Sequence, residues 1–374
     1  MKFSIDRELL QQTLVDVSRG LSDKKPLPVL TGIKIEALDS ELVFTTTNKE
    51  ISVQIKLPCN ENVVIEEKGY CVVPGKYFVE IAKKIEGKIV DFTLFEEKTI
   101  KITSERSDFT LVAYDKEFFP IINFETKDNC LSFESKKLKQ LIRQTAFAAA
   151  TSEARIILTS VNFTITNDLI IVTATDSFRL ARKEENIPTN EIKGIVNIPG
   201  KSLEELGKIL DDSQELVKLY LIDKTALFVY KNISFLTRLV EGNYPDTSPL
   251  FPKQQLLSVK FKKADIVAAV DRASLFTNSE NLSVVKFSVS GSNLVEISSN
   301  STEIGKVVEV VEAIEISNNF PFQTAFSTKY LTDALRAIDD QVIIVNFTGE
   351  VKPAIIKGES TPEMTQLLLP VRVF

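Results

Sequence analysis

The sequence predicts an α+β protein made of three similar domains in tandem, each with two helices backed by antiparallel sheet. Two kinds of helical segment recur three times along the chain, and the segments between them alternate apolar with polar residues. The length of 374 residues suits this organisation, because a domain usually has about 100–200 residues. Repeats of whole-domain size therefore decide the predicted fold class.

The first repeated segment reads PGKYFVEIAKKI at 74–85, PGKSLEELGKIL at 199–210 and, with lower similarity, STKYLTDALRAI at 327–338. Counted from the lysine at its third position, each copy has apolar or small residues two, five, six and nine positions later. This spacing marks one face of a helix, so all three copies are predicted to be short amphipathic helices in one register. The face residues are Phe78, Ile81, Ala82 and Ile85; Leu203, Leu206, Gly207 and Leu210; and Leu331, Ala334, Leu335 and Ile338.

The second repeated segment starts at a phenylalanine, which is Phe3, Phe133 or Phe261, and continues with a helical pattern. In the first copy the leucines are displaced by one residue relative to the other two copies. The expected helix faces are Leu138, Leu141, Ile142 and Thr145 in the second copy, and Ile266, Ala269, Val270 and Ala273 in the third.

The segments between these helices are predicted to be half-buried antiparallel strands. Apolar residues alternate through 33–57 and again through 161–175, where Asn167-Asp168 supplies turn residues. Each third of the chain is expected to hold roughly eight such strands beside its two helices. The boundaries are expected near Phe124 and Phe251, close to the FFP and LFP stretches, which divides the chain into domains 1–124, 125–251 and 252–374.

Composition excludes several kinds of catalytic site. The chain has no histidine, so no triad or His-bound metal site can form. Its three cysteines are scattered, which fits a reducing cytoplasm better than a disulfide framework. No segment resembles a signal peptide or a membrane span. We therefore expect a cytoplasmic protein that is not an enzyme and has no metal or cofactor.

The distribution of charge points to a polyanion. The net charge is −6, yet the six candidate helices together carry more basic than acidic residues. Lysines on helices can contact phosphates without reading bases, which predicts sequence-independent, salt-sensitive contact with duplex DNA. An ordinary solvated helix surface explains the same charge count equally well.

The stretch GIVNIPGKSL at 194–203 resembles a phosphate-binding loop but does not match its spacing. Five residues separate Gly194 from Gly200, whereas the nucleotide-binding pattern requires four. Pro199 also lacks the N–H that would face a phosphate. Because the other repeat copies lack the pattern, we interpret Pro-Gly-Lys as the start of a repeated helix.

Some stretches have no counterpart in the other thirds, and they carry a family resemblance. They are ATDSFRLA at 174–181, EGNYPDTSPLFP at 241–252 and the terminal LLLPVRVF at 367–374. Together with the MKF opening and PLPVL at 26–30, they make the chain resemble the bacterial DNA polymerase III beta subunit family, the sliding clamps, from end to end. The family pattern often has Gly-His where this chain has Ser177-Phe178, and this chain ends one residue later than some members.

The resemblance implies a clamp-type fold in which two chains close head to tail into a six-domain ring around duplex DNA. It implies a non-catalytic processivity factor that tethers the replicative polymerase. A domain-repeat scaffold that binds proteins without encircling DNA is the alternative. The candidate DNA-binding residues are Lys24, Lys25, Lys76, Arg143, Lys201 and Lys263.

Two further sites follow from the resemblance. The dimer interface would place the first domain of one chain against the third domain of the other, through Phe78, Ile81, Phe109, Leu111, Leu275 and Phe276; a place in the internal core is the alternative for Phe78 and Ile81. A pocket between the second and third domains would take a short glutamine-led peptide with a Leu-Phe-like end, from polymerases, the clamp loader and repair proteins. Its lining would be Leu158, Thr175, Ser177, Arg179, Leu180, Pro245, Leu250, Leu369, Pro370, Val371 and Arg372. The terminal LLLPVRVF can also be an edge strand, which does not conflict with a place in the pocket wall.

Overall fold

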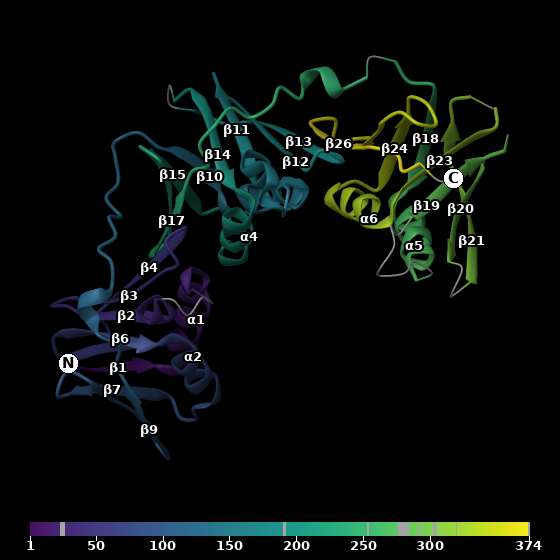
Figure 1. Ribbon diagram of the computed structural model, residues 1–374. Helices are drawn as coiled ribbons and strands as arrows, with labels where there is room; N and C mark the ends of the chain where they lie inside the picture. Colours follow the sequence, from purple (N-terminus) through teal and green to yellow (C-terminus); the bar gives the residue numbers. More distant parts are fainter. Residues whose placement is uncertain are drawn as a thin grey trace. The chain divides into compact units, whose positions relative to one another are not determined.

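The computed structural model describes residues 1–22, 27–189, 192–252, 254–275, 284–290, 292–301, 305–318 and 320–372. In these ranges the chain forms six α-helices and four antiparallel sheets. The chain divides into two compact units, Met1–Leu138 with Glu205–Leu239, and Lys139–Glu204 with Val240–Phe374. Figure 1 shows the helices and strands of each unit.

The first unit contains two sheets. The five-stranded sheet has the order β5 (Val63–Glu67), β1 (Lys2–Asp6), β7 (Ile89–Phe95), β8 (Thr99–Ser104) and β9 (Ser107–Val112). The eight-stranded sheet has the order β10 (Leu131–Glu134), β15 (Leu216–Ile222), β16 (Thr225–Tyr230), β17 (Ile233–Arg238), β4 (Ile51–Pro58), β3 (Glu41–Thr47), β2 (Gly32–Ala37) and β6 (Gly69–Pro74).

The second unit also contains two sheets. The nine-stranded sheet has the order β14 (Gly194–Pro199), β11 (Ser160–Thr166), β12 (Leu169–Thr175), β13 (Arg179–Asn186), β26 (Met364–Leu368), β25 (Ala354–Gly358), β24 (Val342–Phe347), β18 (Leu257–Lys262) and β22 (Glu315–Ile316). The four-stranded sheet has the order β21 (Gly305–Glu312), β20 (Leu294–Ser301), β19 (Val284–Val289) and β23 (Phe322–Ser327).

Two of these sheets run across the boundaries between the repeats. In the first unit, β4 of the first third pairs with β17 of the second third, with Val53 opposite Phe235. In the second unit, β13 of the second third pairs with β26 of the last third, with Arg179 opposite Leu368. The repeats are therefore joined by continuous strand pairing, which their internal similarity did not predict.

The six helices lie where the repeats predict them, two in each third. Every one follows a strand without an intervening loop, so the repeated element is a strand that turns directly into a helix. Phe3, Phe133 and Phe261 lie in the strands that precede α1, α3 and α5, and all three are buried. The helices are α1 (Arg7–Val17), α2 (Gly75–Lys84), α3 (Ser135–Thr145), α4 (Gly200–Ile209), α5 (Lys263–Ser274) and α6 (Thr328–Ala337).

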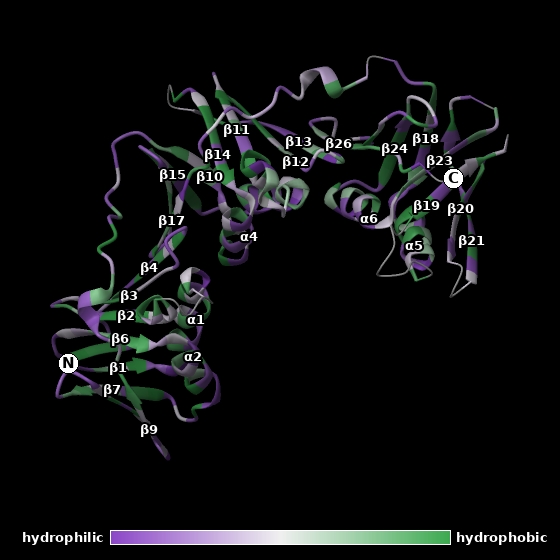
Figure 2. Ribbon diagram, in the orientation of Figure 1, coloured by the Kyte–Doolittle hydropathy of each residue, from purple (hydrophilic) through white to green (hydrophobic). Residues whose placement is uncertain are grey.

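The predicted helix faces pack against the sheets. In the third copy Leu331, Ala334, Leu335 and Ile338 are all buried, and the faces of α3 and α5 are buried as well. The helices α1 and α2 lie side by side on one side of their strands (Figure 1), and these strands contain both hydrophobic and hydrophilic stretches (Figure 2). In the first third, Phe3 stacks on Phe92 with ring centroids 4.7 Å apart, and Phe78 of α2 meets Phe92 edge to face at 6.0 Å.

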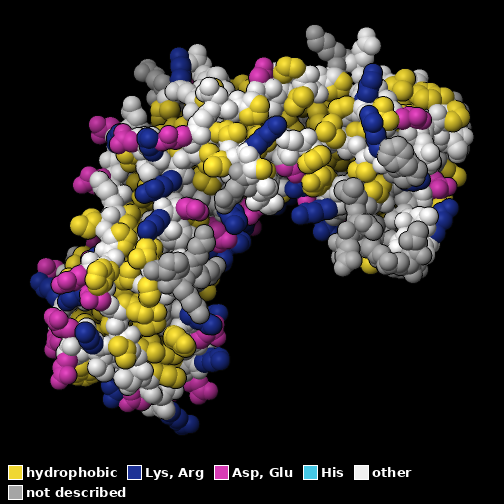
Figure 3. Space-filling view, viewed as in Figure 1, with side chains coloured by type: hydrophobic (Ala, Val, Ile, Leu, Met, Phe, Trp, Pro, Cys, Tyr) yellow, Lys and Arg dark blue, Asp and Glu magenta, His cyan; other side chains and the backbone are white. Residues whose placement is uncertain are grey.

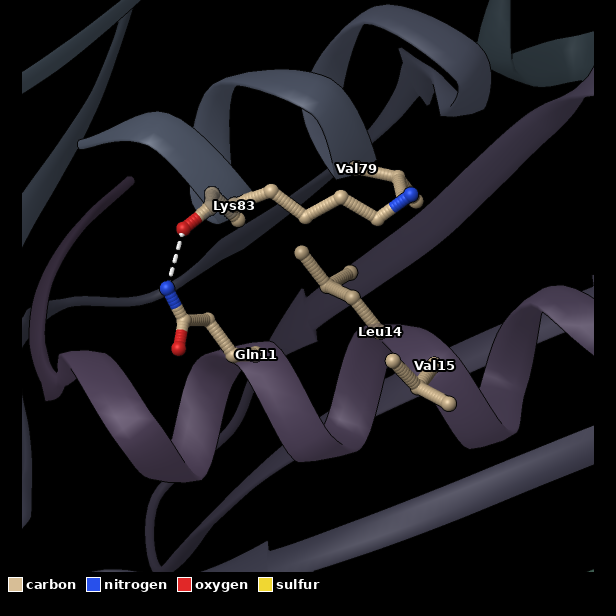
Figure 4. A pocket seen from close by; sticks show the side chains of 6 residues that line it. Gln11, Leu14, Val15, Val79 and Lys83 are labelled. Atoms are coloured by element: carbon tan, nitrogen blue, oxygen red, sulfur yellow. Dashed lines mark hydrogen bonds between the residues drawn. The ribbon is translucent and has the colours of Figure 1, made fainter.

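A small cavity of about 220 Å³ lies between α1 and α2 (Figure 4). Leu14 and Val79 give it apolar walls, and Gln11 crosses from α1 to α2 by donating its Nε2–H to the Ala82 carbonyl at 2.6 Å. The Lys83 side chain extends along the α2 side of the cavity. None of the described helices is long and apolar enough to span a membrane.

The Pro-Gly-Lys stretches are strand-to-helix junctions, as the repeats indicate. Pro74 and Pro199 end β6 and β14, and the glycine that follows is the first residue of the helix. A Cβ on Gly75 would lie 2.8 Å from the carbonyl oxygen of Thr31, so a side chain has no room there. The stretch at 194–203 is accordingly part of this junction, with β14 running straight into α4.

We expect Gly75→Ala to destabilise the first unit by about 1–3 kcal/mol, because the added methyl group must displace the Thr31 backbone or Leu21. This loss opposes the gain in helix propensity that alanine normally brings. Urea unfolding of the full chain measures the change. Lys76→Ala, at the neighbouring exposed position, is the control and should alter the urea midpoint of unfolding little. An unchanged midpoint for Gly75→Ala would contradict the close packing of Gly75 against Thr31 and Leu21.

Candidate functional site

The stretch ATDSFRLA forms a tight turn between β12 and β13. The Asp176 carboxylate accepts the backbone N–H groups of Phe178 at 2.9 Å and Arg179 at 3.0 Å. The Thr175 hydroxyl donates to the Arg179 carbonyl at 2.6 Å. Ser177 takes a left-handed φ of 79°, which is unfavourable for a residue with a side chain and is held here by the surrounding hydrogen bonds. The turn directs Phe178 outward and Arg179 inward.

Arg179 is buried, with 7% of its surface exposed, and each of its three guanidinium nitrogens donates a hydrogen bond. It donates to the Asp176 carboxylate at 3.0 Å, to the Asp333 carboxylate at 2.6 Å and to the Phe147 carbonyl at 2.6 Å. The guanidinium carbon lies 5.1 Å from the centre of the Phe147 ring and 4.4 Å from that of Tyr330. Because Tyr330 and Asp333 belong to α6, Arg179 ties this turn to the last third of the chain.

The outer end of this stack is an exposed aromatic surface. The Phe178 side chain is 59% exposed, and its ring stacks on Tyr330 with centroids 6.4 Å apart and planes at 23°. Leu369 donates its backbone N–H to the Phe178 carbonyl at 2.9 Å, which fixes the terminal segment beside the turn. We call Phe178, Tyr330 and Leu369 the apolar shelf. A shelf of this kind can hold an apolar or aromatic side chain of a ligand.

Two further segments reach the same region. The Tyr244 hydroxyl accepts the Thr175 N–H at 3.0 Å, which places the neighbouring Pro245 beside the turn, and burial raises the pKa of Tyr244. Phe251, which follows Leu250, packs on the buried cluster of Leu180, Ile355 and Leu367.

The predicted pocket residues lie in the second unit, in two layers. Leu158, Thr175, Arg179 and Leu180 are buried, whereas Ser177, Pro245, Leu250, Leu369 and Arg372 are exposed, and Pro370 and Val371 are half-buried. The hydrogen bonds above connect the turn, the Tyr244 segment and the terminal segment. Phe178 and Tyr330 are not among the site residues that the sequence predicts. Phe178 could have been recognised as an apolar residue where the family often has Gly-His, and Tyr330 as the tyrosine that follows Lys329 in the repeated helix. Val371 and Arg372 also line a cavity of about 290 Å³.

The candidate DNA-binding residues fall into different settings. Lys76 and Lys201 are exposed in the first turns of α2 and α4. Arg143 is bonded to the Asp339 carboxylate, and Lys263 donates to the Ile338 carbonyl, so the segment after α6 holds both. Burial lowers the pKa of Lys263. Lys24 and Lys25 lie outside the described residues. Basic and acidic side chains lie side by side over the face in view in Figure 3.

The candidate interface residues are also divided. Phe78 is 1% exposed and lies in the core, which is the alternative that the sequence left open, so its side chain is not available to a second chain. Ile81 is half-buried on α2. Phe109 and Leu111 share one face of β9, which is an edge strand. Leu275 is 72% exposed after α5. Phe276 lies outside the described residues.

No cluster of three or more Cys, Asp or Glu side chains that could hold a metal ion occurs in the part of the chain that the structure describes. The pKa of the buried Cys71 thiol is raised by burial to about 12, so this thiol is not a reactive nucleophile.

Comparison with known proteins gives matches along the full chain. Residues 1–123, 132–246 and 248–372 match the families described as the N-terminal, central and C-terminal domains of the DNA polymerase III beta subunit. The chain is 40% identical to the beta sliding clamp of Staphylococcus epidermidis over 379 aligned residues, covering 100% of both chains. The crystal structure of the DNA polymerase sliding clamp from Bacillus subtilis is similar with a TM-score of 0.93 at 38% identity, and that of the DNA polymerase III beta chain from Streptococcus pneumoniae with 0.92 at 30%; each covers 100% of both chains.

We expect Arg179→Ala to destabilise the second unit by about 3 kcal/mol, because the Asp176 carboxylate loses its charged partner and the Phe147 carbonyl loses its hydrogen bond from Arg179. Urea unfolding of the full chain measures this loss. Arg372→Ala is the matched control, since it removes the same charge from an exposed position and should leave the midpoint unchanged. Equal midpoints for the two variants would refute the structural role of Arg179.

Proposed function

This chain belongs to the DNA polymerase III beta subunit family, the beta sliding clamps, and we propose that two copies of it close head to tail into a ring around duplex DNA. As a DNA sliding clamp it is a processivity factor and not an enzyme. The full-length match to the three family domains carries this function, and it disfavours a scaffold that never encircles DNA. The domain boundaries 1–124, 125–251 and 252–374 remain part of the proposal, as does a place in the cytoplasm.

Two open sheet edges support the proposed ring. The strands β9 and β21 end their sheets, in the first and last thirds of the chain. They expose apolar residues, with Val112 69%, Val308 45% and Val310 59% exposed. An open edge of this kind can pair with a strand of another chain. In a head-to-tail dimer, the β9 region of each chain contacts the β21 region of the other chain. Each region is used once per chain, so the two contacts close a ring and leave no region unpaired. Ile81, Phe109 and Leu111 on one side, with Leu275 and Phe276 on the other, complete the proposed interface.

The proposed DNA contacts are weak and replaceable. Lys76 and Lys201 occupy equivalent positions of repeated helices and form no ion pair within the described part of the chain. Contacts from such lysines to phosphates carry no sequence information and weaken with salt. Lys24, Lys25, Arg143 and Lys263 add to this set. A closed ring can slide while such contacts exchange, because its retention depends on ring closure.

The proposed partners bind through short peptides. The apolar shelf, together with Leu180, Leu250 and Pro245, suits the Leu-Phe-like end of a glutamine-led peptide from a polymerase, the clamp loader or a repair protein. Ser177 and the terminal segment 369–372 offer polar and backbone groups that fix its orientation, and Thr175 supports them from the buried layer through its hydrogen bond to the Arg179 carbonyl. Since the guanidinium of Arg179 is already engaged by Asp176 and Asp333, this residue supports the site from beneath.

Leu275→Asp tests the ring. The change places a charge at a residue that is already 72% exposed, so the monomer should fold normally while the dimer dissociation constant rises by at least about tenfold. Sedimentation at micromolar concentration measures the mass. Leu216→Asp, at a β15 residue that is 55% exposed, should leave the dimer intact. Wild-type protein loaded onto nicked circular DNA should remain bound until the circle is cut; a wild-type monomer, or protein that stays on cut DNA, would contradict the ring.

Phe178→Ala tests the peptide site. We expect affinity for a glutamine-led peptide ending in Leu-Phe to fall about three- to tenfold, because the peptide loses the stacking surface beside Tyr330. Fluorescence anisotropy with a labelled synthetic peptide measures the effect. Phe118→Ala is the control, since it removes an exposed phenylalanine from the first unit, where the side chain is 73% exposed. If both variants bound the peptide as tightly as the unaltered chain, the site would lie elsewhere.

A further inference from the structure

The strand β23 has a sheet partner on one side only. It pairs with β19 and ends the four-stranded sheet. Two other segments touch its outer side. The Glu350 carboxylate accepts the backbone N–H of Gln323 at 3.2 Å, and Val371 donates its backbone N–H to the Ala325 carbonyl at 2.8 Å.

Between these two contacts the edge is unpaired. In an antiparallel pair, the N–H and C=O of one residue point to the same side of the strand, and the side alternates from residue to residue. The contacts to Glu350 and Val371 show that Gln323 and Ala325 both point away from β19. Their remaining groups, the Ala325 N–H and the Gln323 C=O, therefore point to the same outer side. Within the described part of the chain, no segment pairs with these two groups.

This gap opens into a cavity of about 290 Å³ with a positive lining. Lys286 stands directly opposite Ala325 in the β19–β23 register. Lys286 and Arg372 form no ion pair in the described ranges, whereas the Glu350 carboxylate already accepts a backbone hydrogen bond. Ala325 is 4% exposed, so its N–H lies at the cavity floor. The lining residues are Lys286, Gln323, Thr324, Ala325, Glu350, Val351, Val371 and Arg372.

We propose that this cavity is a second part of the peptide site, which takes an acidic, extended segment flanking the partner's glutamine-led motif. The segment adds a short strand to β23, with its own C=O accepting the Ala325 N–H and its N–H donating to the Gln323 C=O. A carboxylate side chain of the same segment meets Lys286 and Arg372. The inference rests on the proposed peptide-binding function, because Val371 and Arg372 belong to both places.

Two features favour this occupant over others. The free donor and the free acceptor lie two residues apart on one strand edge, which matches the backbone of an extended peptide. Lys286 and Arg372, which have no ion pair among the described residues, favour a carboxylate over a neutral or basic side chain. The terminal segment continues from the peptide site into this cavity, so one chain can reach both. The alternative occupant is the chain's own end, residues 373–374.

Synthetic labelled peptides test the proposal. A peptide with the glutamine-led motif is made alone and with two Glu or two Gln residues added at either end. When the extension is at one of the two ends of the motif, the Glu-extended peptide should bind about fivefold more tightly than the Gln-extended peptide. A difference of this size is expected from exposed ion pairs. Lys286→Glu should abolish this preference and leave the Gln-extended peptide within about twofold. Lys218→Glu, an equivalent change at an exposed β15 lysine, should preserve it.

A backbone measurement completes the test. The Ala325 amide should exchange more slowly with solvent in the presence of the Glu-extended peptide than with the motif alone. The inference would be overturned, with the motif still binding, if the Glu- and Gln-extended peptides had equal affinities whichever end carries the extension. It would also be overturned if Lys286→Glu weakened the binding of both extended peptides by the same factor. A Glu preference that appears only after removal of residues 373–374 would also overturn it, because the chain's own end would then fill the gap. Failure of the motif alone to bind the wild-type clamp would overturn the proposed peptide function itself.

Discussion

Backbone hydrogen bonding at sheet edges is the constraint on which this structure depends. An edge strand leaves a row of N–H and C=O groups that need a partner or water. Here the repeats meet by pairing edge with edge, β4 with β17 and β13 with β26. The central third therefore gives strands to both compact units, and three similar sequence repeats become two units with continuous sheets. Strand pairing thus connects domains that sequence similarity alone would leave separate.

The same constraint indicates where partners can attach. The edges of β9 and β21 end their sheets with exposed valines, and they suit a second copy of the chain. The edge of β23 is covered in part by Glu350 and Val371 and is open between them. The proposed function needs both kinds of contact, because the proposed ring would close around DNA while its partners bind and leave. In the proposed function, a long strand edge would close the ring and a short stretch of edge would bind a peptide.

Arg179 connects the fold to the candidate peptide site. Its guanidinium bridges the β12–β13 turn to α6 through Asp176 and Asp333, and it lies between the rings of Phe147 and Tyr330. This arrangement holds Phe178 at the surface, stacked on Tyr330. The charge of Arg179 is already balanced by two carboxylates, so the outer face of the site is mainly apolar. Peptide recognition at the proposed site would depend on shape and on backbone groups more than on that cation.

The sequence by itself determined the elements that local periodicity encodes. The threefold repeat, the faces of α2 through α6, the recurring phenylalanines and the Pro-Gly-Lys junctions all follow from spacing within about a dozen residues. The unrepeated stretches and their family resemblance indicated the segments of the candidate site. Only the tertiary structure decided that Phe78 lies in the core, that Asp333 engages Arg179 and that β23 keeps a gap in its edge. These features depend on which distant strands and helices meet and in which register, and a period of 2 or 3.6 residues carries no information about that choice.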